Sequence, residues 1–318
     1  METKIGSETS GCHRTEKIAR RIAMITVSKL TLTYPSGKGV FDLDFTVPKG
    51  CVTGYLGPNG AGKTTTLRAL LGFMRPNSGK CNVAGLDCIE QAPEVQKRLG
   101  YIPGEIAFPD GMAGDEFLSF MSAMRGTKST ARQKQLLDMF ELDPRGRIKR
   151  FSKGMKQKLG IVAAFMHYPE VLILDEPSSG LDPLMQNRLA ELMLSEKAQG
   201  RTVLMSSHMF EEVEKVCDSV LIIKDGRIVK QAAVQALKDA QRRVFVLATA
   251  DTSRATQVLQ AAGFVPQNDP SGALLVPVAG DSIDRFVKTA AQLTVHDLSL
   301  KHQSLEDIFI DFYGKEAK

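Results

Sequence analysis

A loop suited to binding phosphate lies at residues 57–66, where the sequence reads GPNGAGKTTT after the strand-like run CVTGYL. Gly57 and Gly62 are five positions apart, and Lys63 and Thr64 follow at once. Glycines let successive backbone N–H groups turn inward around phosphate oxygens at the start of a helix. The lysine can reach the β- and γ-phosphates, and the threonine hydroxyl can bind Mg²⁺. The pattern predicts a nucleotide-binding P-loop rather than a glycine-rich turn with an exposed lysine.

Two carboxylates follow a second apolar run, VLIL. They can bind a metal ion and activate water, which a phosphate-binding loop does not do by itself. Asp175 ends this run and Glu176 comes next. At the carboxyl edge of a parallel sheet, Asp175 can hold Mg²⁺ directly or through water. Glu176 can orient or deprotonate a water molecule aimed at the γ-phosphate. An acid pair after a strand also serves to cap helices, but its position 112 residues after Lys63 favours the catalytic interpretation.

The elements around these motifs alternate between apolar strands and helices. EVLILDEP and RTVLMSSH predict buried strands, and the segment between them predicts a helix with Asp182 as its N-cap before Pro183. Apolar strands that alternate with helices indicate an α/β fold, in which a parallel sheet is covered on both faces. Ligands bind at the carboxyl ends of the strands in such sheets.

The pattern divides the chain into three parts. Polar residues 1–23 predict a flexible extension, and residues 24–231 contain the phosphate-binding and acidic motifs together with a helical insertion at about 105–168. Residues 232–318 predict a small α+β domain. That domain ends in SLEDIFIDFYG, where the capping-box spacing of Ser304 and Asp307 predicts a helix with an apolar stripe.

Composition excludes several classes of protein. The 318 residues are 24% charged and 43% hydrophobic, which is ordinary for a globular protein. The net charge of +5 is scattered along the chain and does not favour nucleic-acid binding. Five cysteines without close spacing predict neither a disulfide framework nor a zinc site, and reduced thiols are expected. No run approaches 18 uncharged apolar residues, so no membrane span is predicted.

Four motifs in order, GPNGAGKTT, FSKGMKQKL, VLILDEPSSGLD and VLMSSH, make residues 24 to about 230 resemble the ATP-binding cassette (ABC) ATPases. FSKGM is the discriminating motif, since other P-loop classes lack such a signature 23 residues before the second acidic motif. FSKGM and GYIPGE look like the ATPase subunits of bacterial or archaeal exporters, of multidrug or antibiotic type. The resemblance implies a RecA-like P-loop NTPase core with a helical subdomain, followed by a small C-terminal α+β domain.

The resemblance also implies roles for residues outside the P-loop. Ser152 and Gly154 begin a helix that faces the γ-phosphate bound by the partner subunit. His208 matches the switch histidine, which contacts the γ-phosphate, and Tyr34 falls where an aromatic ring stacks on adenine.

The motif also departs from the family. Phe151, Lys153 and Met155 differ from the usual signature, in which the sequence is Leu-Ser-Gly-Gly-Gln. The metal-binding glutamine that follows GYIP in the family is replaced by Gly104, which leaves Glu105, one position later, as the candidate ligand.

The expected site combines these residues. Glu176 and His208 are the candidate catalytic residues, and the candidate metal ligands are Thr64, Asp175 and Glu105. The candidate ATP contacts are Tyr34, Gly57, Pro58, Asn59, Gly60, Ala61, Gly62, Lys63, Thr64, Thr65, Ser152 and Gly154.

The function implied by the resemblance is hydrolysis of MgATP by a homodimer that drives export through a separate integral membrane permease. The expected location is the cytoplasmic face of the cell membrane, with no nucleic-acid partner. The alternative is a soluble ABC ATPase acting on ribosomes or nucleic acid. Such proteins usually carry two cassettes, or coiled-coil or zinc-bearing insertions, and the sequence has neither. A P-loop kinase, the third class, has no need of a signature motif.

Overall fold

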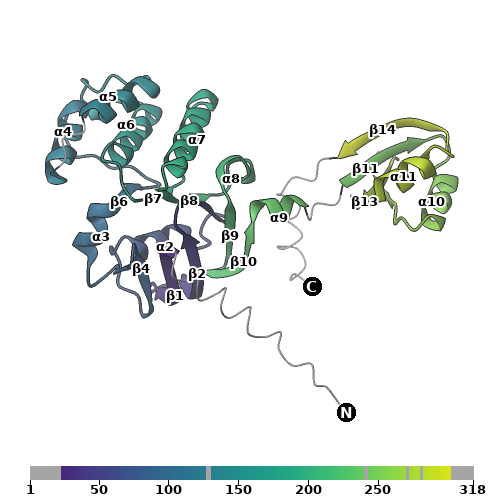
Figure 1. The fold of residues 1–318 in the computed structure, drawn as a ribbon, viewed down its shortest axis with the longest axis horizontal. Helices are drawn as coiled ribbons and strands as arrows, with labels where there is room; N and C mark the ends of the chain where they lie inside the picture. Colours follow the sequence, from purple (N-terminus) through teal and green to yellow (C-terminus); the bar gives the residue numbers. More distant parts are fainter. Residues whose placement is uncertain (1–22, 127–129, 240–242, 270–271, 280–281, 302–318) are drawn as a thin grey trace, which may run out of the picture. The chain divides into compact units, whose positions relative to one another are not determined.

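The computed structural model describes residues 23–126, 130–239, 243–269, 272–279 and 282–301 (Figure 1). The chain forms two compact units, Met1–Val234 and Gln235–Lys318, which divide three residues after the expected position 231. The predicted extension lies outside the described residues except for Ala23, and the helix predicted from Ser304 lies outside them entirely.

A six-stranded sheet with the order β10-β9-β3-β8-β7-β6 forms the centre of the first unit. All neighbours pair in parallel except the antiparallel edge pair β9 and β10. These strands are β3 (Val52–Leu56), β6 (Leu99–Ile102), β7 (Val171–Asp175), β8 (Thr202–Ser207), β9 (Ser219–Lys224) and β10 (Arg227–Ala233). The predicted parallel sheet is thus confirmed, and β3, β7 and β8 are buried along their whole length.

Helices cover both faces of this sheet. The relevant helices are α2 (Lys63–Leu70), α7 (Pro183–Ala198) and α8 (Phe210–Val216). Gly54 of β3 faces α8, where a Cβ would lie 2.9 Å from Val213 Cγ1. Its neighbour Tyr55 faces the opposite side, where its hydroxyl lies 3.0 Å from Thr66 Oγ1 of α2. Because successive side chains of a strand point to opposite faces, α2 and α8 cover opposite faces.

A second, antiparallel sheet packs over α2. It has the order β2-β1-β4-β5, formed by β1 (Ala23–Thr33), β2 (Gly39–Pro48), β4 (Ser78–Val83) and β5 (Leu86–Asp87). α2 contacts β2 and β4 of this sheet and β7 of the parallel sheet. Its buried side chains Leu67 and Leu70 share one core with Val27 of β1 and Ile173 of β7. The helix that carries Lys63 is therefore fixed between two sheets.

The chain between β6 and β7 is largely helical. It contains α4 (Gly114–Met124), α5 (Thr130–Met139), a 3₁₀ turn (Ile148–Arg150) and α6 (Lys153–Phe165), and it follows α3 (Ala92–Arg98). α4 and α5 both contact α6. Asp182 caps α7, as predicted, because its carboxylate accepts a hydrogen bond from Met185 N. Among the described residues, no helix has the length and apolar character needed to cross a bilayer.

A buried ionic cluster joins α5 to α7. Glu196 of α7 is fully buried, and its carboxylate contacts the guanidinium groups of Arg132 and Arg201. Both guanidinium carbons lie over the ring of Tyr168, at 5.3 and 5.0 Å from its centroid. Because an unpaired charge here would be strongly destabilising, the cluster holds the helical segment to the core.

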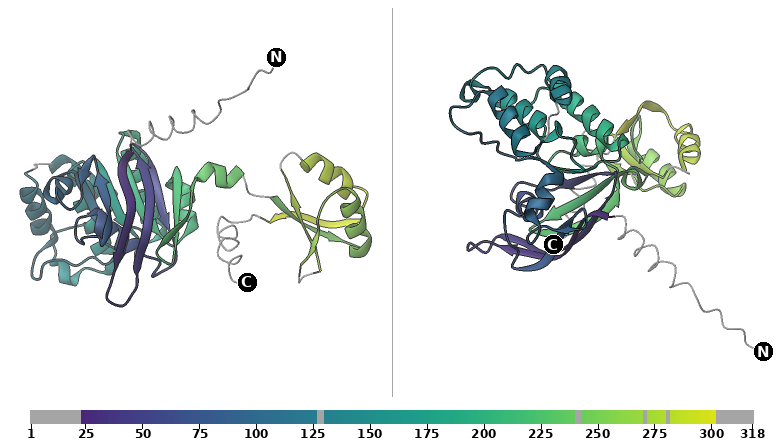
Figure 2. Two further views of the ribbon diagram at one scale, coloured as in Figure 1. Left: turned by 90° about the horizontal axis from the view of Figure 1, so that it is seen from below. Right: turned by 60° about the vertical axis from the view of Figure 1, so that its left-hand side comes forward.

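The second unit is a small α+β domain (Figure 2). Its elements are β11 (Arg243–Thr249), α10 (Thr252–Ala261), β12 (Gln267–Asn268), β13 (Leu274–Val278), α11 (Ile283–Ala290) and β14 (Val295–Lys301), and α9 (Val234–Asp239) precedes them. The sheet order β12-β13-β11-β14, antiparallel throughout, is that of a split β-α-β fold. Leu247, Leu259, Val276 and Phe286 form its own core between the sheet and the two helices.

Candidate active site

The P-loop connects β3 to α2, so the strand, loop and helix expected from the sequence are present in order. Gly60 and Gly62 have φ of 83° and 107°, a region that residues with side chains rarely adopt. A Cβ on Gly62 would also lie 2.5 Å from Val40 Cγ1. The loop needs glycine at these positions, and it leads into the N-terminus of α2, where backbone N–H groups favour an anion.

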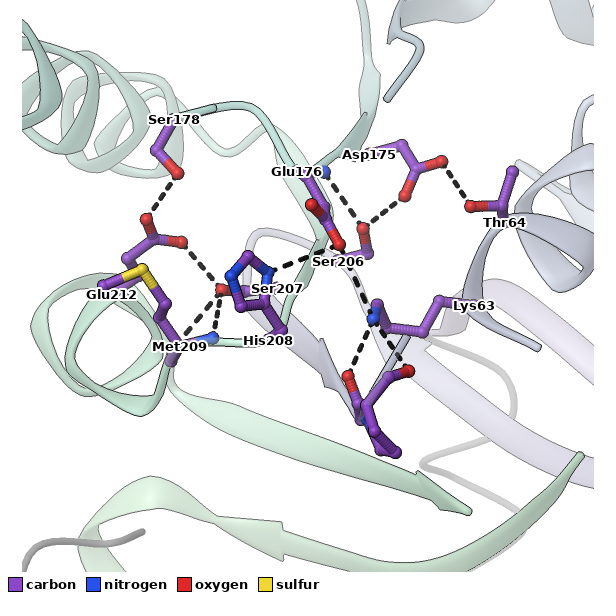
Figure 3. Close-up of polar contacts among 12 residues, drawn as sticks. Lys63, Thr64, Asp175, Glu176, Ser178, Ser206, Ser207, His208, Met209 and Glu212 are labelled. Carbon is purple, nitrogen blue, oxygen red and sulfur yellow. Dashed lines mark hydrogen bonds and ion pairs between the residues drawn. The ribbon is translucent and has the colours of Figure 1, made fainter. Parts of the chain in front are cut away.

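Lys63 is the first residue of α2 and is only 5% exposed. Its Nζ donates hydrogen bonds to Gly57 O at 2.7 Å and Pro58 O at 3.2 Å, and lies 3.6 Å from Glu176 Oε1 (Figure 3). Burial lowers the pKa of Lys63, while the charges of Glu176 and Asp175 oppose this shift. The lysine is thus a buried cation held at the loop by two carbonyl groups and the carboxylate of Glu176.

Asp175 lies at the carboxyl end of β7 and is 2% exposed. Its Oδ2 accepts a hydrogen bond from Thr64 Oγ1 at 2.8 Å, and its Oδ1 accepts one from Ser206 Oγ at 2.5 Å. Ser206 Oγ in turn accepts a bond from Glu176 N at 3.0 Å. A hydroxyl and a carboxylate that already meet are the hard oxygen donors that Mg²⁺ prefers, so the residues present fit this metal.

Glu176 lies between two nitrogen-bearing side chains. Its Oε1 is 3.4 Å from His208 Nδ1 and 3.6 Å from Lys63 Nζ. Its side chain is 29% exposed, so its carboxylate remains accessible from outside. Its backbone φ of 46° is left-handed, an unusual conformation for a residue with a side chain. A carboxylate at this opening can orient a water molecule and accept its proton.

A further set of polar side chains supports the loops of the site. Gln157 Nε2 of α6 donates to Pro177 O at 2.7 Å, next to Glu176. Glu212 of α8 accepts hydrogen bonds from Ser178 Oγ and Ser207 Oγ. These residues and Ser206 are absent from the sequence-based site. The serines lie within the quoted motifs DEPSSGLD and VLMSSH, but nothing in the sequence pairs them with Glu212 or Gln157.

The structure places Tyr34 beside α2 and the signature residues at the start of α6. The Tyr34 hydroxyl lies 3.4 Å from Thr65 Oγ1 and 3.4 Å from Met74 Sδ. Ser152 is the N-cap of α6, and its Oγ accepts from Met155 N at 3.2 Å. Ser152 is therefore a helix cap within its own chain, and it is exposed at that end of α6.

The glycines near the expected metal and signature positions lie in close contacts. A Cβ on Gly154 would lie 2.9 Å from Gly180 O, which places the start of α6 against the loop after Glu176. A Cβ on Gly104 would lie 3.2 Å from Asp175 Oδ2. The residue next to Asp175 is therefore Gly104, whereas Glu105 is exposed.

Comparisons with known proteins agree with this geometry. A family model described as ABC transporter matches residues 40–179. The ABC transporter ATP-binding protein NatA of Bacillus subtilis (strain 168) is 37% identical over 211 residues, which cover 64% of this chain and 86% of NatA. The bacitracin transport ATP-binding protein BcrA of Bacillus licheniformis is 31% identical over 300 residues, which cover 92% of this chain and 97% of BcrA. A solved ATP-binding subunit of an ABC transporter aligns with a TM-score of 0.63 and 31% identity, covering 68% of this chain and 92% of that chain.

Proposed function

This chain belongs to the ATP-binding proteins of ABC transporters, and we propose that it is the ATP-hydrolysing subunit of an exporter with a separate membrane permease. The observation that carries the proposal is the meeting of four side chains. Thr64 of α2 lies within hydrogen-bond distance of Asp175 at the end of β7, and Lys63 of α2 lies within ion-pair distance of Glu176, the residue after β7. This is the set that P-loop enzymes use to transfer a phosphoryl group.

The residues of this chain divide the reaction between them. Lys63 and the N–H groups at the start of α2 bind the β- and γ-phosphates of ATP. Thr64 and Asp175 would hold Mg²⁺, which when bound neutralises charge on the phosphate oxygens. Glu176 orients a water molecule and accepts its proton as the water oxygen attacks the γ-phosphorus. The bond to the β–γ bridging oxygen then breaks, giving ADP and phosphate, with His208 beside the γ-phosphate.

A second copy of the chain completes the site in this proposal. Ser152 and Gly154 lie at the N-terminus of α6, and Ser152 is exposed there. The positive end of a helix dipole favours a negatively charged group. We therefore place the γ-phosphate bound by one copy against the α6 N-terminus of the other, so that two MgATP join a homodimer.

The permease contact is proposed for the helical segment and its surroundings. Phe120 and Met124 of α4 are 43% and 71% exposed, and Phe73, in edge contact with Tyr101, is 58% exposed. Exposed apolar side chains are common at protein interfaces. Docking of permease loops here would hold the subunit at the cytoplasmic face of the membrane. BcrA, named for bacitracin transport, matches 92% of this chain, which supports an antibiotic-type exporter over a ribosome- or nucleic-acid-acting ATPase.

Glu176→Gln tests the function, because this variant keeps the size of the side chain and removes the proton acceptor. We expect hydrolysis to fall by about 10²–10⁴ while MgATP binding persists. Because hydrolysis no longer releases the nucleotide, MgATP and not MgADP should shift the variant from monomer to dimer in sedimentation experiments. Glu191→Gln, an exposed glutamate of α7, is the matched control. Hydrolysis near the wild-type rate in Glu176→Gln would refute the role of Glu176.

The permease proposal has a separate test. Phe120→Ser together with Met124→Ser should abolish co-purification with the permease and leave the ATPase rate of the isolated subunit unchanged, because both side chains are exposed on α4. Undiminished co-purification would place the contact elsewhere.

A further inference from the structure

We propose that Glu212 is a positioning residue that fixes Glu176 and His208 relative to each other by joining the loops that carry them. The inference rests on the proposed function of the site and adds to it a residue that acts through the loops carrying Glu176 and His208. Glu212 lies in the first turn of α8, which follows the His208 loop directly.

The contacts of Glu212 are specific on both of its oxygens. Oε1 accepts a short hydrogen bond from Ser178 Oγ, and Oε2 accepts one from Ser207 Oγ at 2.7 Å (Figure 3). Ser207 Oγ also lies 3.2 Å from Met209 O, but a hydroxyl has one proton, and the nearer, charged carboxylate is the stronger acceptor. Met209 N donates to Ser207 Oγ at 2.9 Å and completes the arrangement. Each serine therefore has a defined orientation.

The two serines lie in the two loops that carry Glu176 and His208. Ser178 lies two residues after Glu176, and Ser207 directly precedes His208. Ser206 already links the ends of β7 and β8, through Asp175 Oδ1 and Glu176 N. Glu212 is the second link between the same two chain segments, on the other side of the Glu176 and His208 side chains (Figure 3). With both links present, neither loop can shift without breaking a hydrogen bond to a charged group.

The backbone conformation of Glu176 explains why a second link between the loops is needed. Its left-handed conformation, with φ of 46°, is unfavourable for a residue with a side chain and persists only when the surroundings hold it. On the N-terminal side it is held by the bond from its own N–H to Ser206. On the C-terminal side the turn is closed by Ser179 N bonding to Glu176 O at 3.1 Å, and Ser178 is anchored to Glu212.

The proposal predicts a loss in catalytic rate without a loss in nucleotide binding, since Lys63 and the P-loop do not depend on Glu212. For Glu212→Ala we expect kcat to fall by about 10- to 100-fold, because small misplacements of catalytic groups are costly. The Kd of MgATP for the monomer should stay unchanged. The kcat of Glu212→Gln should lie between that of Glu212→Ala and that of wild type, because the glutamine amide oxygen can still accept a hydrogen bond from a serine. Glu211→Gln, the exposed neighbour on the same turn, is the matched control and should keep wild-type kcat.

A double-mutant cycle with Ser178→Ala separates positioning from a general effect on stability. Ser178→Ala removes one hydroxyl, so it keeps the fold testable even if Glu212→Ala unfolds. It should lower kcat in the wild-type background, have little effect in Glu212→Ala, and have a smaller effect in Glu212→Gln than in wild type. Independent, additive effects, or a wild-type kcat in both Glu212→Ala and Ser178→Ala, would overturn the proposal. If Glu176→Gln is inactive in the same assays while the Glu212 variants are normal, only this inference fails.

Discussion

Thr64 Oγ1 lies 2.8 Å from Asp175 Oδ2, which brings together two residues 111 positions apart in the chain. The contact joins the first turn of α2 to the carboxyl end of β7. Two of the three candidate metal ligands, Thr64 and Asp175, are therefore brought together by the packing of a helix against a strand, and their roles can be tested one by one.

Asp175→Asn tests the metal site, because asparagine keeps the shape of aspartate and removes its charge. We expect the variant to bind ATP without Mg²⁺ at least as well as wild type, since repulsion of the phosphates is reduced. It should lose most of the gain in affinity that Mg²⁺ provides, because a neutral amide is a weaker ligand than a carboxylate. Titrations with and without Mg²⁺ measure this gain. An unchanged dependence on Mg²⁺ would remove Asp175 from the metal site.

Lys63→Met tests the P-loop, because methionine keeps much of the buried volume and removes the cation. We expect tight MgATP binding to be lost, since the charge that faces the β- and γ-phosphates is gone. Equilibrium binding measures the loss directly, and thermal unfolding shows that the fold is retained. The exposed Lys49→Met is the control. Wild-type affinity in Lys63→Met would contradict the assignment.

Ser152→Asp separates the two roles of Ser152. Aspartate caps helices about as well as serine, so the stability of the chain should be kept, whereas alanine should cost about 1 kcal/mol. The added negative charge repels a γ-phosphate presented by the partner copy, so hydrolysis should be lost. MgATP binding by the monomer should be unchanged in both Ser152→Asp and Ser152→Ala. Equal loss of monomer binding would show that Ser152 acts on nucleotide in its own chain.

His167 makes stability depend on pH. Burial, with the nearby charge of Arg125, lowers the pKa of His167 to about 4, and Nε2 lies 3.0 Å from Leu99 O. The unfolded chain therefore binds a proton near pH 6.5 that the folded chain does not. The contribution of neutral His167 to the free energy of unfolding is fully present above pH 6.5. We expect the free energy of unfolding to fall by up to about 3 kcal/mol as the pH drops to 4.

The contribution of His167 can be isolated by substitution. His167→Gln should flatten the change in free energy of unfolding between pH 7 and pH 4, because glutamine does not titrate. His296→Gln, at an exposed histidine of β14, should leave the pH dependence as in wild type. Urea unfolding at several pH values measures both. The same pH dependence in His167→Gln and wild type would show that His167 titrates alike in both states.

The parts of the site that follow from local sequence were predictable, and the parts that depend on packing were not. The P-loop, Asp175 and Asp182 stand next to strand and helix signals that are visible in the sequence. Ser178 and Glu212 are 34 positions apart, and only the packing of α8 brings them together. α2 ends at Leu70, just before Gly72, which adopts a left-handed φ of 72°. The strand order of the second unit likewise depends on contacts between distant segments.

The ionic cluster around Glu196 has a consequence for the order in which the chain folds during synthesis. Arg132 leaves the ribosome 64 residues before Glu196, and Arg201 follows Glu196. Until α7 is complete, the guanidinium group of Arg132 lacks its ion-pair partner Glu196, and burying an unpaired guanidinium group is costly. We therefore expect α5 to dock late, after residue 196 has emerged. Nascent chains stalled before that residue should remain open to proteolysis in the α4–α5 segment, and chains stalled well beyond it should be protected.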